Sequence, residues 1–294
     1  MSPFPAPLLI TDSSCDLPTE VLDGLGVEVL HLGFSIGDEH HVDDLGASMS
    51  HASFYDLMRG DAAPTTSAIP IGDYVAAFER AGAAGRPVLL LGLSSALSSS
   101  YEAALAARDM VIAKRPHSDI RIVDSLNASL ALGLLVYLAA GRIAAGADID
   151  ALEGWVLEAR TGVNGYFTLE SLEHLRRGGR ISDVAAFAGT MLDVRPVLRI
   201  DAHGQLVFAG QARGRRKSMK ALVDVIEQRV IAPEGQTIFV AHGDAGADAE
   251  LLEAMVRERV PFADVVLAEI GPVIGSHVGP GMLAVVFVGR DRLS

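Results

Sequence analysis

The chain of 294 residues contains one cysteine, Cys15, so it cannot form an internal disulfide bond. This scarcity fits a reducing compartment. The first seven residues lack the basic stretch of a secretory signal, and the short apolar run that follows them ends at Thr11 and Asp12. We therefore expect a cytoplasmic protein.

Long apolar runs and basic charge are also scarce. The longest apolar segment, residues 128–140, is interrupted by Ser129 and Gly133 and falls short of the roughly 20 residues that span a bilayer, so it predicts a buried helix. The 24 basic residues are outnumbered by 37 acidic ones, which gives a net charge of −13. Such a field repels nucleic acid and anionic lipid headgroups. We expect no nucleic-acid partner and at most transient contact with a membrane.

Apolar runs that end in small polar residues recur in the first half of the chain. Residues 8–10, 88–93 and 120–123 are each followed by hydroxyl or carboxylate side chains, and segments of helical period separate them. The pattern is typical of buried parallel strands in an open α/β sheet. Ligands of such sheets bind beyond the carboxyl ends of the strands, where these polar side chains would converge.

The pattern changes after residue 161, where glycines at 162 and 165 indicate a turn-rich break. Residues 167–177 have helical spacing and end at Gly178 and Gly179, a helix stop. Strands are predicted at 194–200, 206–211, 237–241, 265–269 and 282–288, the first two as a hairpin, and helices at 218–230 and 248–260. We therefore predict an N-terminal α/β domain, residues 1–161, with an open parallel sheet flanked by helices, and a C-terminal α+β domain, residues 162–294, with a mixed sheet.

One histidine lies in a glycine-rich segment near the C-terminus. Residues 275–281 place His277 in a turn that glycines and Pro280 would fix, just before an apolar strand. A histidine held in this way is positioned like a group that contacts a ligand. A tight turn in which His277 only bonds a backbone carbonyl accounts for the same residues.

Short motifs along almost the whole chain give it a family resemblance. In order, they are Thr11-Asp12-Ser13-Ser14-Cys15-Asp16-Leu17-Pro18, Thr66-Ser67, Ser94 to Tyr101, Asp124-Ser125, Leu175 to Ile181 and Ser276-His277-Val278-Gly279-Pro280-Gly281. Together they resemble the DegV family. The resemblance implies a cytoplasmic protein of two domains that binds one long-chain fatty acid, such as palmitate, stearate or oleate, between them. It also implies that the acid is presented, with no cofactor in this chain, to a dihydroxyacetone-kinase-like fatty acid kinase, which makes the acyl phosphate for phospholipid synthesis.

The resemblance also assigns the residues that bind the carboxylate, namely Thr66, Ser98 and His277. A carboxylate only accepts hydrogen bonds, so hydroxyl, imidazole and backbone N–H donors suit it. Ser99 stands where the family usually has glycine, and its N–H can still donate. After Thr66-Ser67 the chain has Ala68-Ile69-Pro70 in place of the family's Gln-Pro-Ser, which puts the local turn in doubt. Apolar residues of the tail tunnel are not separable from the core, and Phe167, Phe187, Met191, Leu192 and Ile274 fit either place.

A basic cluster stands out in this acidic chain, made of Arg213, Arg215, Arg216, Lys217 and Lys220. It is typical of a solvated helix N-terminus. By resemblance, Arg213 corresponds to the arginine through which the family engages the kinase. Arg180 is expected to be structural and to pair with a carbonyl or carboxylate near the turn at Gly178 and Gly179.

A serine hydrolase is the alternative of a different class, with Ser98 as nucleophile, His277 as base and Asp124 or Asp12 as the orienting acid. Against it, Ser98 has Ala96 and Ser100 where a nucleophile elbow has glycines.

Two other polar segments carry no predicted function. Residues 38–44 contain Asp, Glu and His, but adjacent histidines tend to point apart and the run indicates a loop in water, so no metal site is predicted. His242-Gly243-Asp244 is expected to turn the chain toward the next helix.

Overall fold

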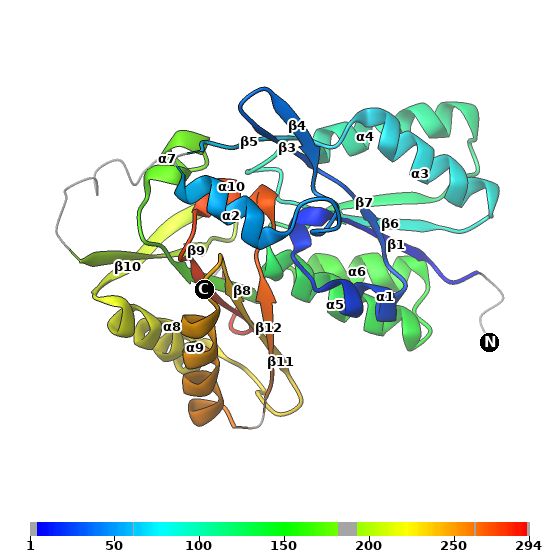
Figure 1. Ribbon diagram of the computed structural model, residues 1–294. Helices are drawn as coiled ribbons and strands as arrows, with labels where there is room; N and C mark the ends of the chain where they lie inside the picture. The colour runs from blue at the N-terminus through cyan, green and yellow to red at the C-terminus, as the bar shows by residue number, and fades with distance from the viewer. Residues whose placement is uncertain (1–4, 61, 182–192, 262, 293–294) are drawn as a thin grey trace.

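The computed structural model describes residues 5–60, 62–181, 193–261 and 263–292. Figure 1 shows two large sheets with helices between and around them, and a small sheet near the top of the view. The two large sheets take their strands from either side of residues 161 and 162.

The first sheet is parallel throughout, in the strand order β2-β1-β6-β7. Its strands are β1 (Leu8–Asp12), β2 (Glu28–Leu30), β6 (Val88–Gly92) and β7 (Ile120–Asp124). Helices α3 (Ile71–Ala83) and α4 (Ser100–Lys114) lie on one side of it, and α1 (Thr19–Leu25), α5 (Leu130–Ala144) and α6 (Ile149–Ala159) on the other (Figure 1). Every residue of β6 is buried, as expected of a central parallel strand. The predicted open parallel sheet is confirmed.

The second sheet is mixed, in the order β10-β9-β8-β13-β11-β12. Its strands are β8 (Val163–Thr168), β9 (Val194–Ile200), β10 (Leu206–Arg213), β11 (Thr237–His242), β12 (Asp264–Glu269) and β13 (Leu283–Val288). Only β11 and β12 pair in parallel among its described strands. The β9-β10 hairpin, helix α8 (Arg215–Arg229) and helix α9 (Gly246–Arg259) follow the sequence prediction.

The prediction for residues 162–177 was wrong at its start. Residues 163–168 form strand β8, and the helix α7 is short (Glu173–Gly178). Every residue of β8 is buried because both faces of this central strand are covered, so the strand lacks the alternation that would distinguish it from a helix. The predicted stop is correct: Gly179 ends α7 with φ of 67°.

A third sheet was not predicted. It has the order β4-β3-β5, with β3 (Gly33–Ile36), β4 (Glu39–Val42) and β5 (Thr65–Ser67), and helix α2 (His51–Arg59) lies between β4 and β5 in the chain. The expectation of a loop in water at residues 38–44 was therefore wrong in part. Glu39–Val42 is a strand, and Asp43, next in the chain, is 2% exposed.

Helix α5 lies between the two large sheets, which confirms the predicted buried helix. One continuous core contains Leu90 from the first sheet, Leu134 from α5 and Val286 from the second sheet. A separate core covers the other face of the second sheet, where Leu222 of α8 and Leu252 of α9 are buried. A helix that is apolar on all sides is stable in water only when it is covered on all sides. No helix among the described residues is long and apolar enough to cross a membrane.

Gly133 in α5 allows the closest approach of this helix to the turn that follows β1. A Cβ atom at Gly133 would lie 2.5 Å from the carbonyl oxygen of Cys15 and 3.0 Å from Leu17 Cγ. At Gly141, in the same helix, nothing lies within 4 Å of such an atom. Gly133 and Gly141 therefore lie in the same helix but differ in the space available for a side chain.

We predict opposite effects on stability for alanine at these two positions. Gly133→Ala lowers the free energy of unfolding by about 1–3 kcal/mol, because the backbone of residue 15 must move. Gly141→Ala raises it by about 0.5–1 kcal/mol, because alanine favours the helix. Urea unfolding of both variants measures the difference, and a Gly133→Ala protein as stable as Gly141→Ala would contradict the packing described here.

Candidate functional site

An apolar pocket lies beside the N-terminal end of α5, between the two large sheets. Ala128 and Ala131 form its floor, while Phe167 of β8 and Ile200 of β9 face it from the second sheet. Its wall is completed by Leu93, Leu97, Leu175, Leu206, Val273, Ile274, Val278, Met282, Ala284 and Val286. The space not filled by atoms is about 1050 Å³, part of it open to solvent. Such a chamber suits a long apolar ligand.

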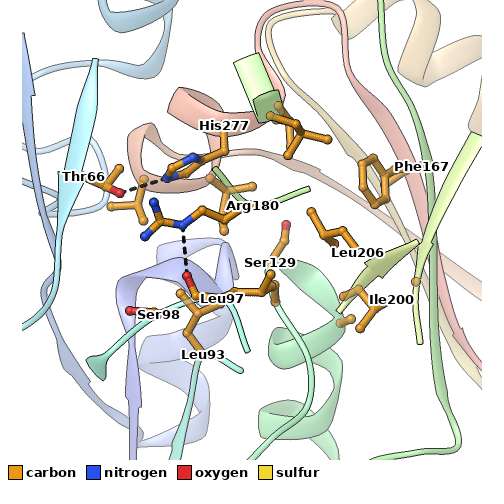
Figure 2. Close-up of a pocket in the computed structure, with 18 of the residues that line it drawn as sticks. Thr66, Leu93, Leu97, Ser98, Ser129, Phe167, Arg180, Ile200, Leu206 and His277 are labelled. Carbon is orange, nitrogen blue, oxygen red and sulfur yellow. Dashed lines mark hydrogen bonds between the residues drawn. The ribbon is translucent and has the colours of Figure 1, made fainter. Parts of the chain in front are cut away.

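Polar side chains gather at one end of the pocket. Thr66, Ser98, Ser99 and His277 all line it, so the structure brings together the four residues singled out in the sequence. They come from three separate elements: strand β5, the loop before α4, and helix α10 (Pro272–Val278). Their role in binding a carboxylate stays a prediction. Figure 2 shows Thr66 and His277 meeting on one side of the Arg180 guanidinium, with Leu97 and Ser98 on the other.

His277 lies in the last turn of helix α10, so the prediction that a turn holds it was wrong. Pro272 stands at the start of this helix, where its fixed φ favours helix formation, and Gly279 ends it with φ of 77°. The imidazole packs against Gly178, where any side chain would collide with the ring. A close contact between α7 and α10 therefore fixes the histidine.

His277 is a neutral hydrogen-bonding group at this site. Burial, and next the nearby Arg180 cation, lower the pKa of His277 to about 4. Its Nε2 atom lies 2.9 Å from Thr66 Oγ1. A neutral imidazole that donates from Nε2 leaves the hydroxyl proton of Thr66 free for a ligand oxygen. The pair therefore offers a donor that does not titrate near neutral pH.

Ser98 and Ser99 occupy the loop between β6 and α4. The Ser98 hydroxyl donates to Ser100 Oγ at 3.0 Å and accepts from the Ser100 backbone N–H at 3.2 Å. Ser98 is half-buried, whereas Ser99 is exposed. Because its present acceptor is only the hydroxyl of Ser100 at the start of α4, Ser98 can redirect its proton to a ligand with little rearrangement.

Arg180 was predicted to be structural, and its contacts with carbonyl groups are confirmed. Its Nε donates to Leu97 O at 3.1 Å and its Nη1 to Gly178 O at 2.7 Å. The structure adds that Arg180 also lines the pocket, as its one cation among the described residues. The sequence did not predict that Arg180 lines the pocket, because it shows only a basic residue that follows the glycines ending a helix. Ser129, at the start of α5, also lines the pocket and was missed.

Arg213 lies at the end of β10, is exposed, and is not among the residues that line the pocket. Its neighbours in the basic cluster differ from one another. Arg215 binds Asp248 at 2.7 Å and Gly281 O at 2.6 Å, which makes it structural, and Lys220 pairs with Asp224. Arg216 and Lys217 are exposed.

The geometry gives no support to a serine hydrolase. Within the described residues, Ser98 bonds Ser100 and His277 bonds Thr66. The two candidate acids are engaged elsewhere. Asp124 accepts from Ser95 Oγ at 2.5 Å, and Asp12 accepts from the Leu93 N–H at 2.7 Å.

The remaining candidates take other places in the fold. In the parts of the chain that the structure describes, no three His, Cys, Asp or Glu side chains are placed to hold a metal ion. His242 accepts from the Ala245 N–H just before α9, as expected of a turn, and Asp244 pairs with Arg59. Of the apolar candidates for the tail, Phe167 and Ile274 line the pocket. Phe187, Met191 and Leu192 lie outside the described residues.

Comparisons with known proteins agree with this architecture. A family model described as "Uncharacterised protein, DegV family" matches residues 8–290. A DegV domain-containing protein of Clostridium perfringens is 41% identical over 285 residues, which cover 97% of this chain and 98% of the relative.

Two solved structures share the fold along nearly the whole chain. A DegV family protein from Thermus thermophilus, whose structure is described as one of fatty acid binding, has a TM-score of 0.87 and 27% identity, and covers 97% of this chain and 100% of that one. A DegV lipid-binding protein from Thermotoga maritima has a TM-score of 0.84 and 26% identity, with 97% and 99% covered. Since the family match extends over almost all of the sequence and a relative reaches 41% identity over its full length, this chain belongs to the DegV family.

Proposed function

We propose that this protein binds one long-chain fatty acid, with the acyl chain in the apolar pocket and the carboxylate at its polar end. One observation carries the proposal: the pocket wall is largely apolar, while Thr66, Ser98 and His277 gather around the Arg180 guanidinium on one side of it (Figure 2). A ligand with a long apolar tail and one anionic head matches this division. The Thermus thermophilus protein of the same fold, described as binding fatty acid, supports the same ligand class.

The tail supplies most of the affinity in this proposal. Burial of a methylene contributes about 0.8 kcal/mol, so about fourteen of them give up to about 11 kcal/mol before the costs of association. A hydrogen bond to a charged group contributes about 1.5–3 kcal/mol. The headgroup contacts therefore orient the acid more than they hold it.

The direct test is to identify what the purified protein carries. The protein is denatured, extracted with organic solvent, and the extract is analysed by mass spectrometry. We expect one dominant fatty acid at close to one molecule per chain. An extract that holds no lipid, together with no binding of added palmitate, would refute the proposal.

Our second prediction concerns the headgroup donors. Ser98→Ala and His277→Ala each weaken palmitate binding by about 1–3 kcal/mol, because each removes one polar contact while the tail stays buried. Isothermal titration measures the change. Ser95→Ala is the matched control, because Ser95 lies in the same loop but bonds Asp124 and does not line the pocket. If both variants bound palmitate as tightly as the parent, the headgroup site would lie elsewhere.

We further propose that the protein presents the acid to a fatty acid kinase and that Arg213 serves this contact. The residue is exposed and outside the pocket, as a partner-binding cation must be. On a protein with a net negative charge, an exposed guanidinium also offers a local positive site to an acidic group of a partner. In this proposal the chain itself is the non-catalytic subunit that delivers the substrate.

The third prediction separates lipid binding from turnover. Arg213→Ala keeps the co-purified fatty acid but fails to support acyl-phosphate formation with the cognate kinase, because the lost charge acts on docking and transfer. Lys220→Ala is the control, since its ammonium is already paired with Asp224. If lipid binding and turnover fell equally, Arg213 would belong to the headgroup site. If turnover did not change, Arg213 and the basic cluster around it would have no role in contacting the kinase.

A further inference from the structure

Asp16 lies outside the lipid pocket and forms hydrogen bonds to two segments that border it. Its Oδ1 atom accepts the Gly271 N–H at 2.9 Å, and its Oδ2 atom accepts the Ser129 hydroxyl at 2.6 Å. Gly271 immediately precedes α10, which carries His277, and Ser129 immediately precedes α5 and lines the pocket. One carboxyl group therefore connects the start of helix α10, which carries His277, to the start of helix α5 beside the pocket.

The far side of Asp16 faces a second, polar pocket. Asp16, Asp43, His51 and Glu269 line it, and its unfilled space is about 640 Å³, part of it open to solvent. Asp43 is 2% exposed, and neither of its carboxylate oxygens has a hydrogen-bond partner among the described residues. A Cβ atom at Gly271 would lie 3.2 Å from Asp16 Oδ1 and 3.6 Å from both Asp43 oxygens, so the two carboxyl groups face the same point of the backbone.

Several titratable groups surround this pair. From α2 comes His51, whose Nδ1 lies 3.5 Å from Glu269 of β12, and Tyr55, which donates to Ile270 O. The chain before β3 supplies His31, which bonds the Asp43 carbonyl, and the buried Cys15 and Asp12 lie on Asp16's own segment. Two carboxyl groups buried together favour retention of a proton, and the neighbouring His51 and His31 only partly oppose this.

The direction of the protonation shift is the same for both groups. Burial raises the pKa of Asp16 to about 8, partly offset by the donors Ser129 and Gly271, and burial also raises the pKa of Asp43 to about 6. For a carboxyl group with a raised pKa, the contribution to folded-state stability is complete below its ordinary pKa near 4 and is lost as pH rises through about 8. Above pH 8 two buried negative charges therefore face each other next to the start of α10.

We propose that Asp16 is a positioning residue for the headgroup end of the lipid pocket, acting through Ser129 and α10, and that ionisation of Asp16 beside Asp43 loosens α10 and speeds ligand exchange. This inference rests on the proposed binding of a fatty acid. It gives a role to the Asp12-to-Asp16 motif and to the buried Asp43, neither of which contacts the pocket directly.

The test compares three variants in the full-length protein. Asp16→Ala removes both hydrogen bonds, Asp16→Asn keeps an acceptor for Gly271 and a polar group for Ser129 but cannot ionise, and Asp23→Asn on α1 is an exposed control. Release of a fluorescent fatty acid is followed by stopped flow between pH 6 and pH 9.5. The parent and the control should release about fivefold faster at pH 9 than at pH 7, with one transition near pH 8.

The two Asp16 variants should behave differently from the parent and from each other. Asp16→Ala should release about tenfold faster than the parent at pH 7, because two hydrogen bonds are missing. Asp16→Asn should stay within about twofold of the parent at pH 7 and show no step near pH 8. An Asp16→Ala protein that releases at the parental rate, or an Asp16→Asn protein that keeps the step, would overturn the proposal.

Hydrogen exchange of the ligand-free protein tests the positioning role of Asp16 independently of whether the protein binds a fatty acid. Protection factors for the peptide covering residues 270–279, corrected for the intrinsic effect of pH, should fall in Asp16→Ala and, in the parent, above pH 8. If the parent binds no fatty acid but shows these losses, the proposed ligand is wrong and the contact between Asp16 and α10 stands. If protection is unchanged in Asp16→Ala, the positioning role is wrong whatever the ligand.

Discussion

The whole structure depends on covering the apolar stretch of helix α5, residues 130–140. Its residues are buried or half-buried around the helix, so one sheet must pack below it and another above it. That requirement brings β1, β6 and β7 into one core with β8 and β13, although these strands are far apart in the chain. Beside the N-terminal end of α5, the apolar pocket lies between the two sheets.

The chemistry of the pocket follows from this burial. A chamber built from core side chains is largely apolar, and most of its polar groups come from β5, the loop before α4, helix α10 and Arg180. The same burial keeps His277 neutral, because the charged imidazole would lose its hydration and lie near the Arg180 cation. A neutral imidazole, the hydroxyls of Thr66, Ser98 and Ser99, and a guanidinium held by carbonyl groups gather at one end of the pocket.

Burial also links the polar end of the first pocket to the second, polar pocket behind it. Asp16 and Asp43 are removed from water because β1, the small sheet and α10 converge there. The backbone N–H of Gly271 and the Ser129 hydroxyl donate to Asp16, while Asp43 faces the second, polar pocket. Two buried carboxyl groups held this close respond to pH as a pair rather than singly.

The sequence by itself determined the secondary structure that local pattern controls. Buried parallel strands, the all-apolar helix, the β9-β10 hairpin and the glycine stop of α7 each depend on residues close together in the chain. The family resemblance carried by short motifs singled out Thr66 and Ser98, and the glycine-rich segment also pointed to His277; the fold brings all three to one pocket. Hydrophobic periodicity did not predict strand β8, because a strand that is covered on both faces shows no alternation of apolar and polar residues.

Only the tertiary structure decided what depends on distance between remote segments. It made Arg180 a pocket residue, because that role requires the loop at Leu97, more than eighty positions away in the chain, to receive its hydrogen bond. It turned Asp43 from an expected loop residue into a buried one, because the small sheet folds it against Gly271. Hydrophobic pattern specifies which residues leave water, but the partner that covers each of them is fixed only when the two sheets close on α5.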